Sequence, residues 1–154
     1  MQAAGIERPE GIPELASWGR RLGAYLIDQL LLAVPVGIGI GLIAAAPDNS
    51  GLSVVGVVVT LAGVILGPAI YYTTFHGSSG QTLAKRWLGL RVVDAQTGAP
   101  IGYGRAFGRW LLFFVLNLLC GILRLLDGLW PLWDAQNQTW HDKAVSTVVV
   151  RLLD

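Results

Sequence analysis

WGRRLGAYLIDQLLL, residues 18–32, places two arginines in front of an apolar run and an aspartate, Asp28, inside that run. A carboxylate in the hydrocarbon of a bilayer costs about 2.5–3.5 kcal/mol on insertion scales, so it needs a partner or a task. Arg21 and Asp28 share one helical face, but they lie about 10 Å apart along the helix axis. We therefore expect Arg21 to extend to the lipid head groups as an interfacial anchor and Asp28 to find its partner on another helix. The alternative is a neutral, hydrogen-bonded carboxyl group that only packs.

The composition around this stretch indicates a membrane protein. Of 154 residues, 53% are hydrophobic and 14% are charged, whereas a soluble domain has about 25% charged residues. The net charge of +1 gives no polybasic signature, so nucleic acid is not an expected partner. With one cysteine, Cys120, and two histidines, we expect neither a disulfide nor a metal or other cofactor. The expected surroundings are the lipid bilayer.

Apolar runs divide the chain into segments. Two of them are long enough to span about 30 Å of hydrocarbon as helices, and a third carries polar residues. We expect everything from 18 to 151 to form one membrane domain. In order, the predicted segments are a flexible tail, two helices, a linking segment, the third apolar run and a polar C-terminal segment: 1–17, 20–46, 52–75, 76–106, 107–133 and 134–154.

The basic residues predict the orientation. The chain from 76 to 109 is rich in Lys and Arg, whereas the turn at 47–51 has neither. By the positive-inside rule the N-terminus and the linking segment face the cytoplasm, as in a multi-pass protein of a bacterial inner membrane. Within the linking segment, residues 81–90 are predicted to lie on the membrane surface as an amphipathic helix. Leu90–Asp94 is predicted to be a strand that forms a small hairpin with Ile101–Tyr103.

The third apolar run, residues 107–133, allows two paths. A straight helix over its apolar core would be about 36 Å long, would span once and would leave the C-terminus outside. A re-entrant or split run that turns near Cys120 would return the C-terminus to the cytoplasm and bring Arg124 and Asp127 toward the depth of Asp28. Turn backbone at that depth must be covered by protein. We favour the cytoplasmic C-terminus.

The two halves of the chain also resemble each other. Residues 19–28 align without gaps with residues 108–117, which sets Asn117 opposite Asp28. In each half a Gln-Thr pair is followed after about ten residues by a Val-Val pair, first at 81–93 and then at 138–149. A genuine repeat would return the second Gln-Thr segment to the cytoplasmic side.

The polar residues of the third run suggest a path for a charge. A set of polar residues recurs at three-, four- and seven-residue spacing and would form one stripe: Asn117, Cys120, Arg124, Asp127 and Asp134. With Asp28 this stripe would suit the movement of a proton or a small cation such as Na⁺ or Li⁺. The alternative is that Arg124 and Asp127 neutralise each other at i,i+3 and merely permit burial. No nucleophile accompanies His141–Lys143 at a recognisable spacing, so we do not expect an enzyme.

Three blocks of sequence resemble the RDD family of bacterial membrane proteins, named for one arginine and two aspartates. The blocks are RLGAYLID at 21–28, GQTLAKRWLGLRVVD at 80–94, and QTWHDK at 138–143 followed by TVVV at 147–150. The resemblance assigns the name residues to Arg21, Asp28 and Asp142. Two departures are Trp140, where the family usually has Leu, and a less basic segment at 134–138. The resemblance implies transport of undefined ligands and, for some members of the family, cation/proton antiport.

Together these observations predict an all-α integral membrane protein that moves a proton, a small cation or an unknown small ligand. Asp28 would titrate, and Arg124 and Asp127 would be its electrostatic partners. One copy of 154 residues can hardly enclose a pathway, so we expect a homo-oligomer or a larger complex. The alternative function is a non-transporting scaffold or accessory subunit that docks a partner through residues 81–94.

Overall fold

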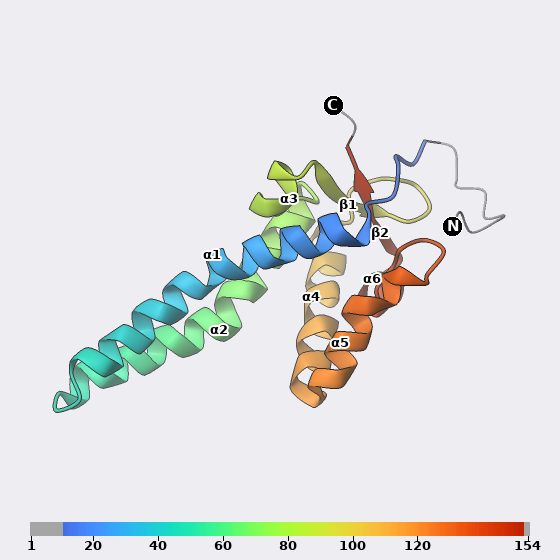
Figure 1. Ribbon diagram of the computed structural model, residues 1–154. Coiled ribbons are helices and arrows are strands. Elements are labelled where there is room, and N and C mark those ends of the chain that lie inside the picture. Colours follow the sequence, from blue (N-terminus) through green and yellow to red (C-terminus); the bar gives the residue numbers. More distant parts are fainter. Residues whose placement is uncertain (1–10, 153–154) are drawn as a thin grey trace.

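The computed structural model describes residues 11–152 of the chain (Figure 1). Helices make up most of this part, and two short strands form a small sheet at one end. The elements in chain order are α1 (Trp18–Ala45), α2 (Ser50–Ser78), α3 (Leu83–Trp87), β1 (Leu90–Asp94), α4 (Gly102–Leu119), α5 (Gly121–Leu129), the 3₁₀ turn η1 (Trp130–Leu132), α6 (Trp140–Ala144) and β2 (Thr147–Arg151).

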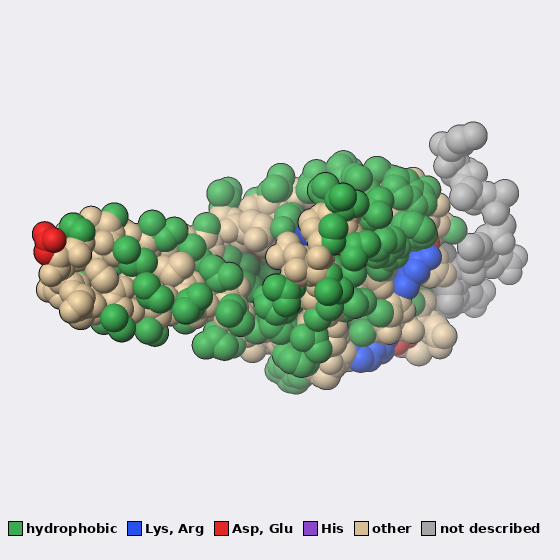
Figure 2. Space-filling model, turned by 90° about the horizontal axis from the view of Figure 1, so that it is seen from below, with side chains coloured by type: hydrophobic (Ala, Val, Ile, Leu, Met, Phe, Trp, Pro, Cys, Tyr) green, Lys and Arg blue, Asp and Glu red, His purple; other side chains and the backbone are tan. Residues whose placement is uncertain are grey.

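Helices α1 and α2 form a long antiparallel arm that extends away from the rest of the molecule (Figure 1). They have 28 and 29 residues and are long and apolar enough to cross a membrane, which confirms the first two predicted helices. Asn49 begins α2 by accepting a hydrogen bond from the backbone N–H of Leu52. Hydrophobic side chains cover the arm and the underside of the protein (Figure 2), as expected for surfaces that face lipid.

The third apolar run is split into α4 and α5. Cys120 has an extended backbone (φ −166°, ψ 128°), which ends α4 and lets α5 turn back beside it. The split path is therefore confirmed, and the straight helix over 107–133 is wrong. A consequence is that the predicted polar stripe does not exist, because the break separates Asn117 from Arg124 and Asp127.

The strand at Leu90–Asp94 is confirmed, but its predicted partner is wrong. β1 pairs antiparallel with β2, with Val92 opposite Val149, whereas Gly102 begins α4. The N–H of Ala16 donates to the carbonyl of Val149 (2.8 Å), and Leu15 forms a bridge with Val150. The end of the predicted tail is thus fixed against the sheet, while residues 1–10 lie outside the described part of the chain.

The predicted repeat is visible on either side of the sheet. In each half a glutamine side chain donates to a strand carbonyl at 2.8 Å: Gln81 to Leu90 and Gln138 to Thr147. The following threonine, Thr82 or Thr139, caps the short helix by accepting an N–H three residues later (3.3 and 3.1 Å). The local sequence Gln-Thr therefore forms the same turn, helix and strand twice.

A small core joins the sheet to the bases of the long helices. Its side chains are mostly small or β-branched, which lets α1, α3 and α4 approach β1 and β2 closely. Ala16 precedes α1, and Ala24 lies within the first two turns of that helix. The buried core residues are Ala16, Ala24, Ala84, Leu90, Val92, Ile101, Ala106 and Val149.

Candidate functional site: buried charges around a cavity

Asp142 of α6 lies at the centre of a buried ion cluster. It is completely buried, and Arg21 of α1 donates a hydrogen bond to its Oδ2. Nη2 of Arg109, from α4, lies 2.5 Å from Oδ1, and the backbone N–H of Thr139 donates to Oδ2 at 3.1 Å. Arg21 also donates to the carbonyl of Asn137. The prediction that Arg21 extends to lipid head groups is therefore wrong, because a buried carboxylate from the far end of the chain is within its reach.

The two arginines keep Asp142 ionised. Burial by itself favours the neutral carboxyl group, but Arg109 and Arg21 outweigh it and hold the pKa of Asp142 well below its usual range. Removing one partner of such a pair leaves an uncompensated charge in a medium that solvates it poorly. The cluster therefore joins the bases of α1 and α4 to the C-terminal segment, and it carries two positive charges for one negative.

Asp28 is buried without a cationic partner. Its Oδ1 accepts hydrogen bonds from the hydroxyl of Tyr71 in α2 (2.6 Å) and from the N–H of Ala84 in α3 (3.3 Å). The expectation of a partner on another helix is confirmed. Among the described residues, Oδ2 has no hydrogen-bond partner and no Lys or Arg nitrogen lies within 4.0 Å of the carboxylate. Leaving such an atom bare costs about 1–3 kcal/mol, so the arrangement calls for an explanation.

Arg124 and Asp127 pair with each other rather than with Asp28. Their closest atoms are 3.8 Å apart, and the guanidinium of Arg124 lies 4.0 Å from the centre of the Phe113 ring. Nδ1 of His141 lies 2.8 Å from the second oxygen of Asp127. The interpretation in which they are electrostatic partners of Asp28 is wrong, and the i,i+3 alternative describes them better.

The repeat identifies a different counterpart for Asp28. Asp28 accepts from the N–H of Ala84, two residues after Thr82, and Asp127 accepts from the N–H of His141, two residues after Thr139 (3.2 Å). Asp127 thus makes the hydrogen bond that Asp28 makes in the first half, although it lies on α5, the second helix of its hairpin, whereas Asp28 lies on α1, the first. Asn117, which the gapless alignment had placed opposite Asp28, is exposed close to the tip of the α4–α5 hairpin and away from the site.

Lys85 and His76 belong to the site but were not predicted from the sequence. Nζ of Lys85 lies 3.1 Å from Nε2 of His76, and both side chains are buried. Burial, together with the nearby Arg109, lowers the pKa of Lys85 to about 7. The repeat contained the signal: Lys85 follows Thr82 at the spacing at which Asp142 follows Thr139.

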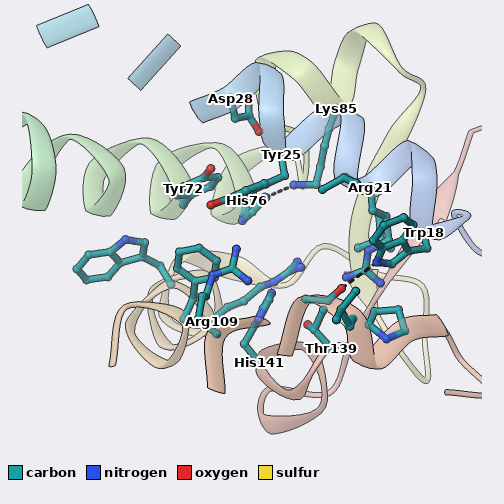
Figure 3. Close-up of a pocket in the computed structure, with 18 of the residues that line it drawn as sticks. Trp18, Arg21, Tyr25, Asp28, Tyr72, His76, Lys85, Arg109, Thr139 and His141 are labelled. Atoms are coloured by element: carbon teal, nitrogen blue, oxygen red, sulfur yellow. Dashed lines mark hydrogen bonds between the residues drawn. The ribbon is translucent and has the colours of Figure 1, made fainter. Parts of the chain in front are cut away.

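These groups surround a cavity of about 390 Å³. Figure 3 shows Asp28, Lys85 and His76 on one side of it and Arg109 and His141 on the other. No three His, Cys, Asp or Glu side chains gather to hold a metal ion in residues 11–152. Arg21, Arg124 and Thr139 also line the cavity. The rest of the lining is Gly128 and apolar or aromatic side chains: Trp18, Leu22, Tyr25, Tyr72, Trp110, Phe113, Leu125, Leu129, Pro131 and Val149.

The fold and the site define a small helical membrane protein in which a buried arginine–aspartate cluster joins two helical hairpins. The sequence model of the RDD family matches residues 15–146, and the chain belongs to that family. Of the three residues that the resemblance assigns to the family name, Arg21 and Asp28 line the cavity, and Asp142 pairs with Arg21.

Several relatives are similar to the chain. An uncharacterised protein of Haemophilus influenzae is 32% identical over 136 residues, covering 88% of this chain and 78% of that protein. The proline-rich antigen homolog of Mycobacterium tuberculosis is 39% identical over 75 residues, covering 49% and 30%, and the proline-rich antigen of Mycobacterium leprae is 28% identical over 150 residues, covering 85% and 59%. The matched region is thus less than two thirds of each mycobacterial protein. No solved structure matches the chain.

Proposed function

We propose that this RDD-family membrane protein moves a proton or a small cation across the membrane, with Asp28 as the group that binds it. The observation that supports this most strongly is the environment of the Asp28 carboxylate. Tyr71 and Ala84 donate hydrogen bonds to Oδ1, whereas Oδ2 has no partner among the described residues, and Asp28 lines a cavity. Ionisable residues at membrane depth commonly mark ion pathways or proton relays. Carboxylate oxygens also suit hard cations such as Na⁺ and Li⁺.

The geometry supplies a rationale for this role. Oδ1 accepts from two donors, which restricts rotation of the carboxylate, and Oδ2 has no partner among the described residues, in a side chain that lines the cavity. Lys85, with its pKa near 7, would change charge close to the pH at which the protein works and so alter the affinity of Asp28 for a cation. Nε2 of His76 lies 3.1 Å from Nζ of Lys85, within hydrogen-bond distance.

The proposal also specifies how the protein is oriented in the membrane and that several copies or partners assemble. The arm formed by α1 and α2 would cross the membrane twice, with the N-terminus and the sheet in the cytoplasm, because the chain between Arg21 and Lys85 has no Lys or Arg. The cavity lies at the junction of the two hairpins of one copy, so a complete pathway would need a homo-oligomer or a larger complex. Crosslinking in native membranes that detects only monomer would argue against this.

The test is the pH change inside liposomes that contain the purified protein, under imposed Na⁺, Li⁺ or K⁺ gradients. Asp28→Asn should abolish the flux, because the amide can neither titrate nor balance a cation. The matched control is Asp48→Asn, in the exposed turn at the far end of the arm, which should retain the wild-type flux. No flux from the wild type, or equal flux from folded Asp28→Asn, would refute the proposal.

A scaffold that docks a partner through residues 81–94 is the second candidate. Most of this segment is used internally, since Thr82, Ala84, Lys85 and Leu90 are buried. Arg86, Trp87 and Arg91 are exposed, and Trp87 is the exposed hydrophobic side chain of the segment, with 70% of its surface accessible. A scaffold predicts that no variant changes ion flux and that Trp87→Ala weakens association with the partner, whereas the transporter predicts that Trp87→Ala leaves flux unchanged.

A further inference from the structure

The cavity has one unused hydrogen-bond donor and one unused acceptor. Nη1 of Arg109 and Oδ2 of Asp28 are both buried and have no partner among the residues described, and both residues line the cavity. Arg109 is 5% exposed and Asp28 is completely buried, so bulk water does not satisfy them. Buried polar groups in folded proteins are almost always paired, and this pair of opposite character therefore points to a ligand.

Lys85 adds a second donor to the same space. Its ammonium group can donate three hydrogen bonds, and His76 is its one side-chain partner among the described residues. Figure 3 shows Lys85 and Arg109 approaching the space from opposite sides. Two cationic donors that face each other across a cavity suit an anionic group with several acceptor oxygens, such as a phosphate.

Apart from Arg21, Arg124 and Thr139, the remaining wall is largely apolar, and it continues to the outside of the protein. Leu22, Leu125 and Leu129 line the cavity, yet 37%, 65% and 37% of their surfaces are exposed. They belong to α1 and α5, whose outer faces carry further exposed leucines (Leu26, Leu126). The polar end of the cavity is thus connected by an apolar rim to the surface that faces lipid.

We propose that this cavity binds a membrane phospholipid whose head group combines a phosphate with a hydrogen-bond donor, as in phosphatidylethanolamine or phosphatidylglycerol. The phosphate accepts from Arg109 and Lys85, and the ammonium or hydroxyl group donates to Oδ2 of Asp28. The acyl chains leave over the leucine rim into the bilayer. Free phosphate would satisfy the two cations but would leave Asp28 bare and the apolar lining unfilled. The inference does not depend on ion transport, because a protein that moves no ion can still hold the lipid.

The experiment is native mass spectrometry of the detergent-purified full-length protein after incubation with phospholipids of equal chain length. We expect phosphatidylethanolamine or phosphatidylglycerol to be retained about tenfold better than phosphatidylcholine, whose quaternary ammonium cannot donate to Asp28. Lys85→Met and Asp28→Asn should each reduce retention about tenfold, because each removes one charge-assisted hydrogen bond.

A pair of rim variants makes the result independent of how well the buried variants fold. Leu22→Trp should obstruct the cavity and abolish the preference, whereas Leu26→Trp, one turn further along α1 and outside the cavity lining, should preserve it. Equal retention of all three lipids, or unchanged retention by Leu22→Trp, would mean that the lipid only surrounds the protein and would overturn the proposal. Displacement of the lipid by inorganic phosphate would overturn it in favour of a soluble phosphate ligand.

Discussion

At the scale of residues, the site separates its three name residues into two roles. Arg21 and Asp142 neutralise each other, with Arg109 as a second cation, and together they hold three distant elements in contact. Asp28 takes no part in this cluster, and its carboxylate is held by a tyrosine hydroxyl and a backbone N–H instead. We therefore expect Arg21 and Asp142 to stabilise the fold and Asp28 to bind a ligand.

This division predicts the effect of Asp142→Asn on stability. The amide retains the shape of the side chain but leaves Arg21 and Arg109 without a negative partner, so the free energy of unfolding should fall by about 3–5 kcal/mol. The measurement is SDS titration in mixed micelles. Asp48→Asn, at an exposed position, should change the same quantity by less than about 0.5 kcal/mol. A loss below about 1 kcal/mol for Asp142→Asn would show that the cluster does not stabilise the fold.

The sequence predicted the positions of these residues better than it predicted which residues they contact. The depth of Asp28 follows from the apolar run around it, and its need for a partner on another helix follows from the free energy of burying a carboxylate. Spacing along one helix could not show that Arg21 meets a carboxylate 121 positions away. The gapless alignment missed Asp127 because Asp127 lies on α5, beyond the break at Cys120, whereas the alignment compared α1 with α4.

At the scale of elements, glycines let α1 and α2 pack closely. A Cβ atom added to Gly39 would lie 2.7 Å from both the carbonyl oxygen of Gly56 and the backbone nitrogen of Thr60. Backbone atoms cannot move aside as a side-chain end does, so the two helices would have to separate. Gly37, one half-turn away, faces open space on the surface of the arm.

We therefore predict that Gly39→Ala lowers the free energy of unfolding by about 1–3 kcal/mol through overpacking of the arm. Gly37→Ala should leave it unchanged or raise it by up to about 1 kcal/mol, since alanine favours a helix more than glycine does. Both are measured by the same SDS titration. Equal effects of the two substitutions would mean that the close α1–α2 contact is not formed.

The elements that sequence predicted well are those whose evidence is local. Long apolar runs gave α1 and α2, and the valine-rich segments gave β1 and β2. The partner of β1 was wrong because antiparallel pairing depends on which strands the rest of the fold brings together, and here the other strand lies more than fifty residues away. The two paths of the third run were left open because Cys120–Gly121 is only a weak interruption of an apolar run.

At the scale of the whole molecule, the sheet joins the beginning, the middle and the end of the chain. Residues 15–16 and β1 both contact β2, so these three segments lie at one end of the molecule (Figure 1). The α1–α2 turn lies at the tip of the arm, which is long enough to reach the other side of a membrane. The short α4–α5 hairpin begins and ends at the side of the molecule where the sheet lies (Figure 1).

This arrangement predicts which positions a membrane-impermeant maleimide reaches from each side. In a Cys120→Ser background, Gln96→Cys after β1 and Ala135→Cys before α6 should be labelled from the same side, because α5 returns the chain to the sheet. Asp48→Cys should be labelled from the opposite side. Comparing intact cells with inverted vesicles should place the first two in the cytoplasm, as the basic residues of 76–109 require. A straight third helix would instead expose Ala135→Cys together with Asp48→Cys, and that pattern would contradict both the hairpin and the pairing of β2 with β1.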